Sequence, residues 1–149
     1  MSGESPDPPP HLSQAAMRQF VAGRAGGRCE YCRAAEVGQL AAFEVEHVVP
    51  TGEGGSDEVA NLAWACGRCN RAKSDRVGVT DPESGVTVAV FDPRAMSWGD
   101  HFDWRGHELV GLTAVGRALV DALDLNSARR VAIRQDERIL GRFPPPAAE

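Results

Sequence analysis

The stretch Cys29-Glu-Tyr-Cys32, completed by Cys66-Gly-Arg-Cys69, decides the fold of this chain, because it supplies two Cys-x-x-Cys pairs with 33 residues between them. Zinc prefers thiolate ligands in a tetrahedron, and each Cys-x-x-Cys turn brings two sulfurs close enough to share one ion. The spacing therefore predicts a structural zinc site made by all four cysteines. Four unrelated buried thiols, or two redox-active pairs, are the alternatives. Redox motifs normally occur once, at a strand-to-helix junction of a βαβ unit, so the pattern favours zinc.

Length and composition limit what surrounds this site. A chain of 149 residues fits one compact domain with tails. No apolar run approaches the ~18 to 20 residues that cross a bilayer, which argues against a membrane protein. The segment MSGESPDPPPH, residues 1–11, is acidic and proline-rich and has neither a basic start nor an apolar core, so it is not a secretory signal. We therefore expect a cytoplasmic protein, in which paired cysteines are more typical of zinc than of disulfides.

The net charge of −5 argues against a generally basic nucleic-acid-binding protein, but the basic residues are clustered. The segment 129–142 holds five arginines, which either form a solvated helix face or follow a DNA backbone. A second cluster lies in the segment that contains the last two cysteines. There we predict contacts to nucleic-acid phosphates from Arg68, Arg71, Lys73 and Arg76.

The pattern predicts helices over residues 13–23, 69–76, 113–123 and 127–140, with Ser13 and Thr113 as N-caps. Strands are expected over 40–49 and 86–91 and in one or two segments of 101–112. The resulting fold class is α+β. We expect four regions: a disordered leader (1–11), a zinc-stabilised core (12–78), an extension of a hairpin and helices packed on it (79–142) and a flexible tail (143–149).

Four polar residues within the cysteine-bounded segment could form a second, chemically active site. Glu46 and His47 are adjacent on an expected strand, and Asn61 and Asn70 follow them. A carboxylate can hold a hard cation, and a neutral imidazole can accept a proton from water. A lone histidine is more often structural, and asparagine is common in turns, so only the combination is informative.

In combination these residues resemble the HNH endonuclease family. The resemblance covers residues 28–76 and rests on the zinc pairs, the strand Glu46-His47-Val-Val-Pro50, the loop Gly54-Gly-Ser56, Asn61-Leu62 and the run from Cys66 to Lys73. It implies a ββα-metal core, in which two short strands and a helix clamp one divalent ion. The later segment 91–126 also looks like a tail that is often joined to HNH modules in bacterial proteins.

The resemblance also implies a role for each residue. His47 would be the general base that activates water, and Asn61 would orient the base and pin the following loop. Glu46 and Asn70 would hold the catalytic ion, with Asn70 at a position where many members carry histidine. An amide oxygen is a hard, neutral ligand, so Mg²⁺ or Mn²⁺ is favoured over Zn²⁺ at this second site.

We therefore expect a metal-dependent endonuclease acting on DNA, with RNA as an open alternative substrate. A homodimer or an accessory protein would be needed for a double-strand cut, since one site cuts one strand. Two rival functions are a zinc-knuckle module that binds nucleic acid without cutting it and a structural or protein-interaction domain. The sequence indicates neither the biological process nor a site preference.

Overall fold

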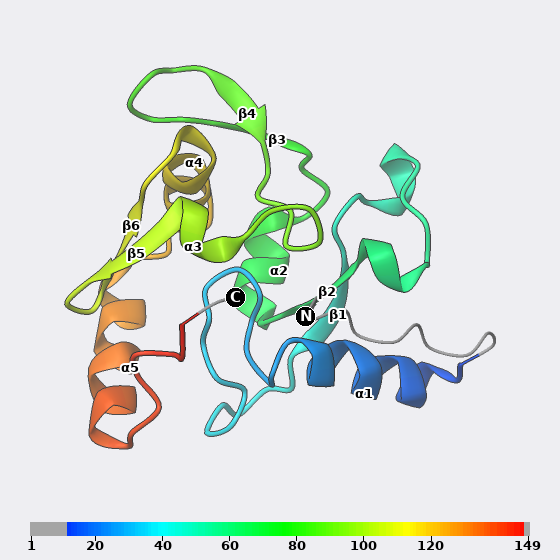
Figure 1. Cartoon of the computed structure of the whole chain (residues 1–149), viewed down its shortest axis with the longest axis horizontal. Coiled ribbons are helices and arrows are strands. Elements are labelled where there is room, and N and C mark those ends of the chain that lie inside the picture. Colours follow the sequence, from blue (N-terminus) through cyan, green and yellow to red (C-terminus); the bar gives the residue numbers. More distant parts are fainter. Residues whose placement is uncertain (1–11, 148–149) are drawn as a thin grey trace.

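A computed structural model describes residues 12–147, and within this range three two-stranded antiparallel sheets alternate with helices (Figure 1). The predicted leader, residues 1–11, lies outside the described residues. In chain order the elements, with η for a single 3₁₀ turn, are α1 (Gln14–Arg24), β1 (Glu44–His47), η1 (Thr51–Glu53), η2 (Val59–Asn61), β2 (Leu62–Ala65), α2 (Gly67–Lys73), β3 (Gly78–Thr80), β4 (Thr87–Ala89), α3 (Trp98–His101), β5 (Phe102–Arg105), β6 (Glu108–Gly111), α4 (Ala114–Ala122) and α5 (Ala128–Ile139).

Side-chain caps begin two helices where the sequence predicts them, and a third cap begins α5, for which none was predicted. The Ser13 hydroxyl accepts a hydrogen bond from the Ala16 amide at 3.1 Å, and Thr113 accepts from Gly116 at the same distance. Ser127 caps α5 through the Arg130 amide at 3.2 Å. Such caps satisfy amide groups that have no partner in the first turn of a helix.

The central unit consists of β1, β2 and α2. Glu46 pairs with Ala63 and His47 with Leu62 across the two antiparallel strands, and α2 follows β2 after a single residue. All four β2 residues are buried, because α1 and α2 pack around this sheet. Strand β1 is shorter than the predicted 40–49, since its partner strand is only four residues long.

Helix α2 also differs from the predicted 69–76 at both ends. It begins at Gly67, because the Cys66 sulfur caps it by accepting from the Cys69 amide at 3.4 Å. It ends at Lys73, because Ser74 takes the positive φ angle of 51°, which breaks the helical path. The residues that were expected to continue the helix instead lead into β3.

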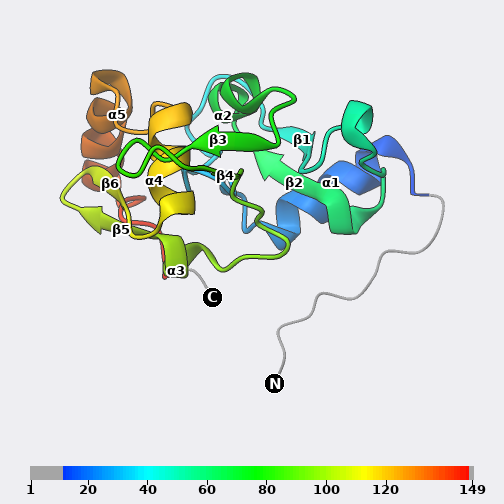
Figure 2. The same cartoon turned by 90° about the horizontal axis from the view of Figure 1, so that it is seen from above.

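The C-terminal half adds two hairpins and three helices beside the central unit (Figures 1 and 2). The predicted strand 86–91 is β4, shortened to Thr87–Ala89 and paired with β3, a three-residue strand too short to stand out in the sequence. The predicted pair in 101–112 is the β5–β6 hairpin. The buried Asp81 carboxylate joins the β3–β4 hairpin to α4, because it accepts two hydrogen bonds from Arg117.

One hydrophobic cluster spans both halves of the described chain. Phe91 packs edge-on against Tyr31 and Phe102, and the Trp98 indole donates to the Tyr31 carbonyl at 3.0 Å. The predicted flexible tail begins too early, because Phe143 is buried and packs its ring edge against Trp104. No helix in residues 12–147 is long and apolar enough to cross a membrane.

A substitution at Gly116 tests how closely α4 packs on the β5–β6 hairpin. A Cβ atom there would lie 2.0 Å from the His101 carbonyl oxygen, so Gly116→Ala must displace backbone and should destabilise the fold by about 1–3 kcal/mol. The matched control is Gly23→Ala in α1, where a Cβ atom would meet nothing within 4 Å. That substitution should be stabilising by about 0.5–1 kcal/mol. Equal denaturation midpoints for the two variants would contradict this packing.

Candidate functional site

The four predicted zinc ligands come together in the structure. Cys29 and Cys32 lie on the turn after α1, and Cys66 and Cys69 lie at the start of α2. All four are buried, and their sulfur atoms lie within 4.8 Å of one another. A tetrahedron with zinc–sulfur bonds of about 2.3 Å has sulfur–sulfur edges of about 3.8 Å, and the Cys32 and Cys66 sulfurs are 3.8 Å apart. The group could therefore hold one zinc ion.

Hydrogen bonds to the sulfurs favour the thiolate form that zinc needs. The Cys32 amide donates to the Cys29 sulfur at 3.5 Å, as the Cys69 amide does to Cys66. Arg130 of α5 donates to the Cys69 sulfur at 3.5 Å. Hydrogen bonds from the other three cysteines lower the pKa of Cys66, whereas burial raises the pKa of the Cys29 thiol. Hydrogen bonds and a positive charge next to a sulfur favour its thiolate, which is the form that binds a metal.

His47 stands at the end of β1 with about one third of its side chain exposed. Its Nε2 lies 2.7 Å from a carboxylate oxygen of Asp57, which is almost fully exposed in the loop after η1. The sequence analysis did not identify Asp57. The only signal for it was an acid directly after the Gly54-Gly-Ser56 loop.

Asn61 fixes that loop with three hydrogen bonds. Its side-chain oxygen accepts from the Val49 amide at 2.9 Å, and its amide nitrogen donates to the carbonyls of Val49 at 3.0 Å and Ser56 at 2.8 Å. The loop passes so close that a Cβ atom on Gly55 would lie 1.7 Å from the Val49 carbonyl oxygen. Asn61 therefore holds the two ends of the loop between β1 and β2 together, next to His47.

Glu46 points to the opposite face of β1, where it is buried against α2. One of its carboxylate oxygens accepts from the Tyr31 hydroxyl at 2.6 Å, and the other lies 2.5 Å from the Lys73 ammonium. Lys73 also donates to the carbonyls of His47 at 3.2 Å and Val48 at 2.9 Å. Burial raises the pKa of Glu46, against the opposing effects of Lys73 and Tyr31.

Asn70 contacts a different glutamate from the one expected. Its amide donates to Glu44 at 2.7 Å, while Lys73, one helical turn later, contacts Glu46. Glu44 and Glu46 thus lie on the face of β1 that meets α2. Within residues 12–147, hydrogen bonds connect Asn70 to Glu44 and not to Glu46. Glu44 was not singled out in the sequence, because an acid at an alternating strand position is common on a solvated face.

One predicted phosphate contact is wrong, and the other three residues are exposed. Lys73 is only 1% exposed and its ammonium is directed at β1, so it cannot reach a phosphate. Arg68 and Arg71 are exposed on α2, and exposed Arg76 donates to the Ala72 and Ala122 carbonyls. Helical spacing alone could not show that Lys73 is buried while these arginines are exposed. Helix α2 is short, and basic residues lie on both its buried and its exposed face.

Comparison with models of protein families matched residues 29–76, about a third of the chain, to the HNH endonuclease family. This segment is an HNH endonuclease domain. The match begins at the first zinc-ligand candidate and contains β1, β2 and α2. Searches of curated proteins and of solved structures gave no match. The HNH domain indicates a nuclease-type function and nucleic acid as the partner.

Removing zinc should unfold the HNH domain. Structural zinc contributes about 10–16 kcal/mol of apparent binding free energy in small domains, and the loops between α1 and β2 have little regular structure to replace it. We expect one zinc per chain by native mass spectrometry, and loss of the near-ultraviolet circular dichroism signal when a chelator is added. A protein that keeps this signal and its melting temperature without zinc would contradict the assignment.

Lys73 and Glu46 should be energetically coupled across the contact between β1 and α2. Lys73→Met leaves a buried carboxylate without its cation, so it should destabilise the protein by about 3–5 kcal/mol. The double variant Lys73→Met/Glu46→Gln should recover at least about 1 kcal/mol of this loss, because no charge then remains buried. Urea denaturation of the wild type, Lys73→Met, Glu46→Gln and the double variant measures the coupling. If the double variant loses as much stability as the two single variants together, the coupling is contradicted.

Proposed function

We propose that the protein is a metal-dependent endonuclease that hydrolyses phosphodiester bonds in DNA, with His47 as the general base. The observation that supports this most directly is the His47–Asp57 pair, at 2.7 Å, within an HNH domain. The pair sits beside the loop that Asn61 fixes and is partly open to solvent. We infer that β1, β2 and α2 act as the ββα-metal core of the family.

Asp57 determines which imidazole nitrogen of His47 is free to accept a proton from water. A carboxylate only accepts hydrogen bonds, so Nε2 of the neutral imidazole carries the proton and donates to Asp57. The lone pair then resides on Nδ1, which takes the proton from the attacking water. The carboxylate stabilises the imidazolium that forms, and a positioned base of this kind contributes ~10²- to 10⁴-fold. Asn61 is a positioning residue, since it fixes the loop that carries Asp57.

We propose that Glu46 and Asn70 hold the catalytic Mg²⁺ or Mn²⁺ between β1 and α2. When bound, such an ion neutralises the phosphoryl oxygens and stabilises the leaving group. The donor set fits a hard cation, because carboxylate and amide oxygens are its usual ligands. The position of Glu46 supports the proposal, since its carboxylate is buried on the face of β1 that meets α2 and already holds one cation there, the Lys73 ammonium at 2.5 Å.

A second carboxylate competes for the same role. Glu44 lies in hydrogen-bond contact with Asn70 and is half-buried, whereas Glu46 must exchange its ion pair with Lys73 to bind a metal. An ion held by Glu46 would therefore take the place of the Lys73 ammonium at that carboxylate. Glu44 is then a neighbour that orients the Asn70 amide.

The endonuclease proposal is tested by nicking of a supercoiled plasmid at low salt, with Mg²⁺, with Mn²⁺ or without added divalent ion. His47→Ala should lower the rate ~10²- to 10⁴-fold while zinc content and melting temperature stay unchanged. His107→Ala, which removes a histidine from the turn between β5 and β6, is the matched control and should cut like the wild type. An RNA of the same sequence distinguishes the two nucleic acids as substrates.

Absence of nicking by zinc-loaded wild type with any divalent ion would overturn the endonuclease proposal. If DNA binding with strong salt dependence persisted, the chain would be a non-catalytic zinc-knuckle nucleic-acid-binding module. If binding were absent as well, a protein-interaction role would remain. Cleavage of both strands whose rate rises with the square of the protein concentration would indicate a homodimer as the cutting species.

Two charge-neutralising variants test the metal ligands. Glu46→Gln should raise the Mn²⁺ concentration needed for half-maximal nicking by at least ~10-fold, because the ion loses a charged ligand. Glu44→Gln should change it little. The reverse order would place the ion at the Glu44–Asn70 pair instead.

A further inference from the structure

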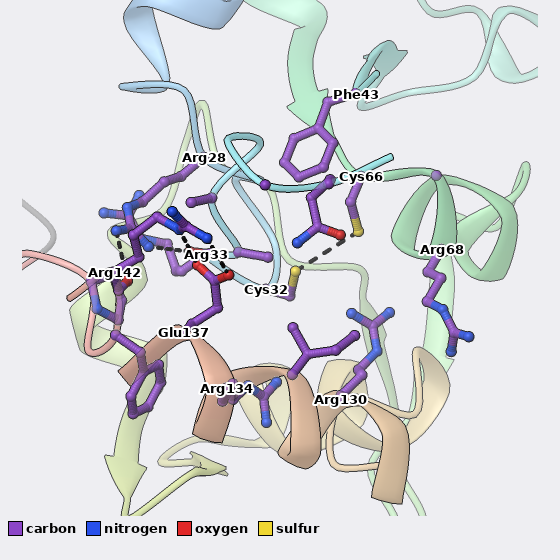
Figure 3. Close-up of a pocket in the computed structure, with 18 of the residues that line it drawn as sticks. Arg28, Cys32, Arg33, Phe43, Cys66, Arg68, Arg130, Arg134, Glu137 and Arg142 are labelled. Atoms are coloured by element: carbon purple, nitrogen blue, oxygen red, sulfur yellow. Dashed lines mark hydrogen bonds and ion pairs between the residues drawn. The ribbon is translucent and has the colours of Figure 1, made fainter. Parts of the chain in front are cut away.

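We propose that an arginine-lined pocket beside the zinc site binds the phosphodiester backbone of the nucleic acid. The pocket has a volume of about 340 Å³ and lies between the first cysteine turn, the start of α2 and α5. Figure 3 shows Arg130 and Arg134 rising from α5, Arg28 and Arg33 on the cysteine turn and Arg68 on α2 around a common space. This inference rests on the proposed function, because it takes nucleic acid as the ligand.

The pocket carries a large excess of positive charge. Among residues 12–147, eight arginines line it, whereas Glu137 is its one carboxylate, and that carboxylate is bound by Arg142. A zinc ion with four thiolates would add two negative charges. Five positive charges then remain in excess on a chain whose net charge is −5. Neutralising the zinc site alone would require only two arginines, so the excess indicates an external polyanion.

The inner arginines hold this charge in place without neutralising it. Arg28 donates to the backbone carbonyls of Arg33 and Arg142, each at 2.9 Å. Arg134 donates to the Leu125 carbonyl at 2.6 Å. Neutral carbonyls orient a guanidinium but leave its charge available to a ligand. The pocket is therefore preorganised for an anion.

The rim supplies the groups that can contact phosphate directly. Arg68 and Arg71 of α2 and Arg129 of α5 are exposed and, within residues 12–147, form no ion pair with a carboxylate. Helix α2 also carries Asn70, so the rim and the proposed metal site share one helix. A strand held at the metal could thus run along α2 toward α5. Arginine's planar fork can bind two oxygens of a phosphate at once, and the proposed nucleic-acid ligand supplies such phosphates.

The test measures binding of a short fluorescent DNA duplex to zinc-loaded full-length protein without added divalent ion, as a function of salt concentration. Arg129→Gln should weaken binding about threefold to tenfold and lower the slope of log Kd against log salt by about 1, because one phosphate contact is lost. Arg105→Gln on β5 is the matched control, since Arg105 is exposed, carries the same charge and lies outside the pocket. Arg129→Lys keeps the charge and should keep the slope. An RNA duplex distinguishes which backbone is preferred.

Equal slopes for wild type and Arg129→Gln, or equal losses for Arg129→Gln and Arg105→Gln, would overturn the pocket proposal. This outcome is separate from failure of the nuclease proposal, because binding is measured without the catalytic ion. A protein that cuts DNA but shows no specific effect of Arg129→Gln would retain the nuclease and lose the pocket. A protein that shows the effect but never cuts would retain the pocket and lose the nuclease.

Discussion

Convergence of four cysteine thiols on one point is the constraint on which the rest of the domain depends. It joins a turn after α1 to the start of α2 across 33 intervening residues, in a segment with short strands and long loops. The Cys66 sulfur also caps α2, so the same atom fixes the metal site and the start of the helix. Because α2 starts at a defined residue, Asn70 and Lys73 face β1 with a defined register.

The contact between α2 and β1 then divides the strand into two chemically different faces. Glu46 points inward to Lys73 and Tyr31, while His47 points outward to Asp57. Burying the Lys73–Glu46 pair has a desolvation free energy cost. The Glu46 carboxylate and the His47 and Val48 carbonyls offset this cost only when they surround the Lys73 ammonium in this geometry. We infer that the pair specifies how α2 docks more than it adds to stability. This docking holds the proposed metal ligands on one side of the strand and the proposed base on the other.

The sequence predicted the parts of this arrangement that short-range chemistry controls. Cysteine spacing and the helix caps at Ser13 and Thr113 each depend on residues near in sequence or on one well-defined bond type, whereas the loop-fixing role of Asn61 was implied only by the family resemblance. The contacts of Lys73 and Asp57 could not be predicted in this way. Lys73 is buried only because α2 packs on β1, and Asp57 reaches His47 only because the loop returns. Both depend on tertiary packing that alternation and helical periodicity do not encode.

We propose that two metals have separate roles in this protein: zinc holds the fold, and a second ion, bound by Glu46 and Asn70, serves the chemistry. The most direct test is electron paramagnetic resonance of Mn²⁺ added to zinc-loaded protein, with zinc content measured in the same sample. We predict one bound Mn²⁺ per chain with zinc retained, and loss of that Mn²⁺ in a folded Asn70→Ala variant. No Mn²⁺ binding, binding that displaces zinc, or binding unaffected by Asn70→Ala would contradict the account.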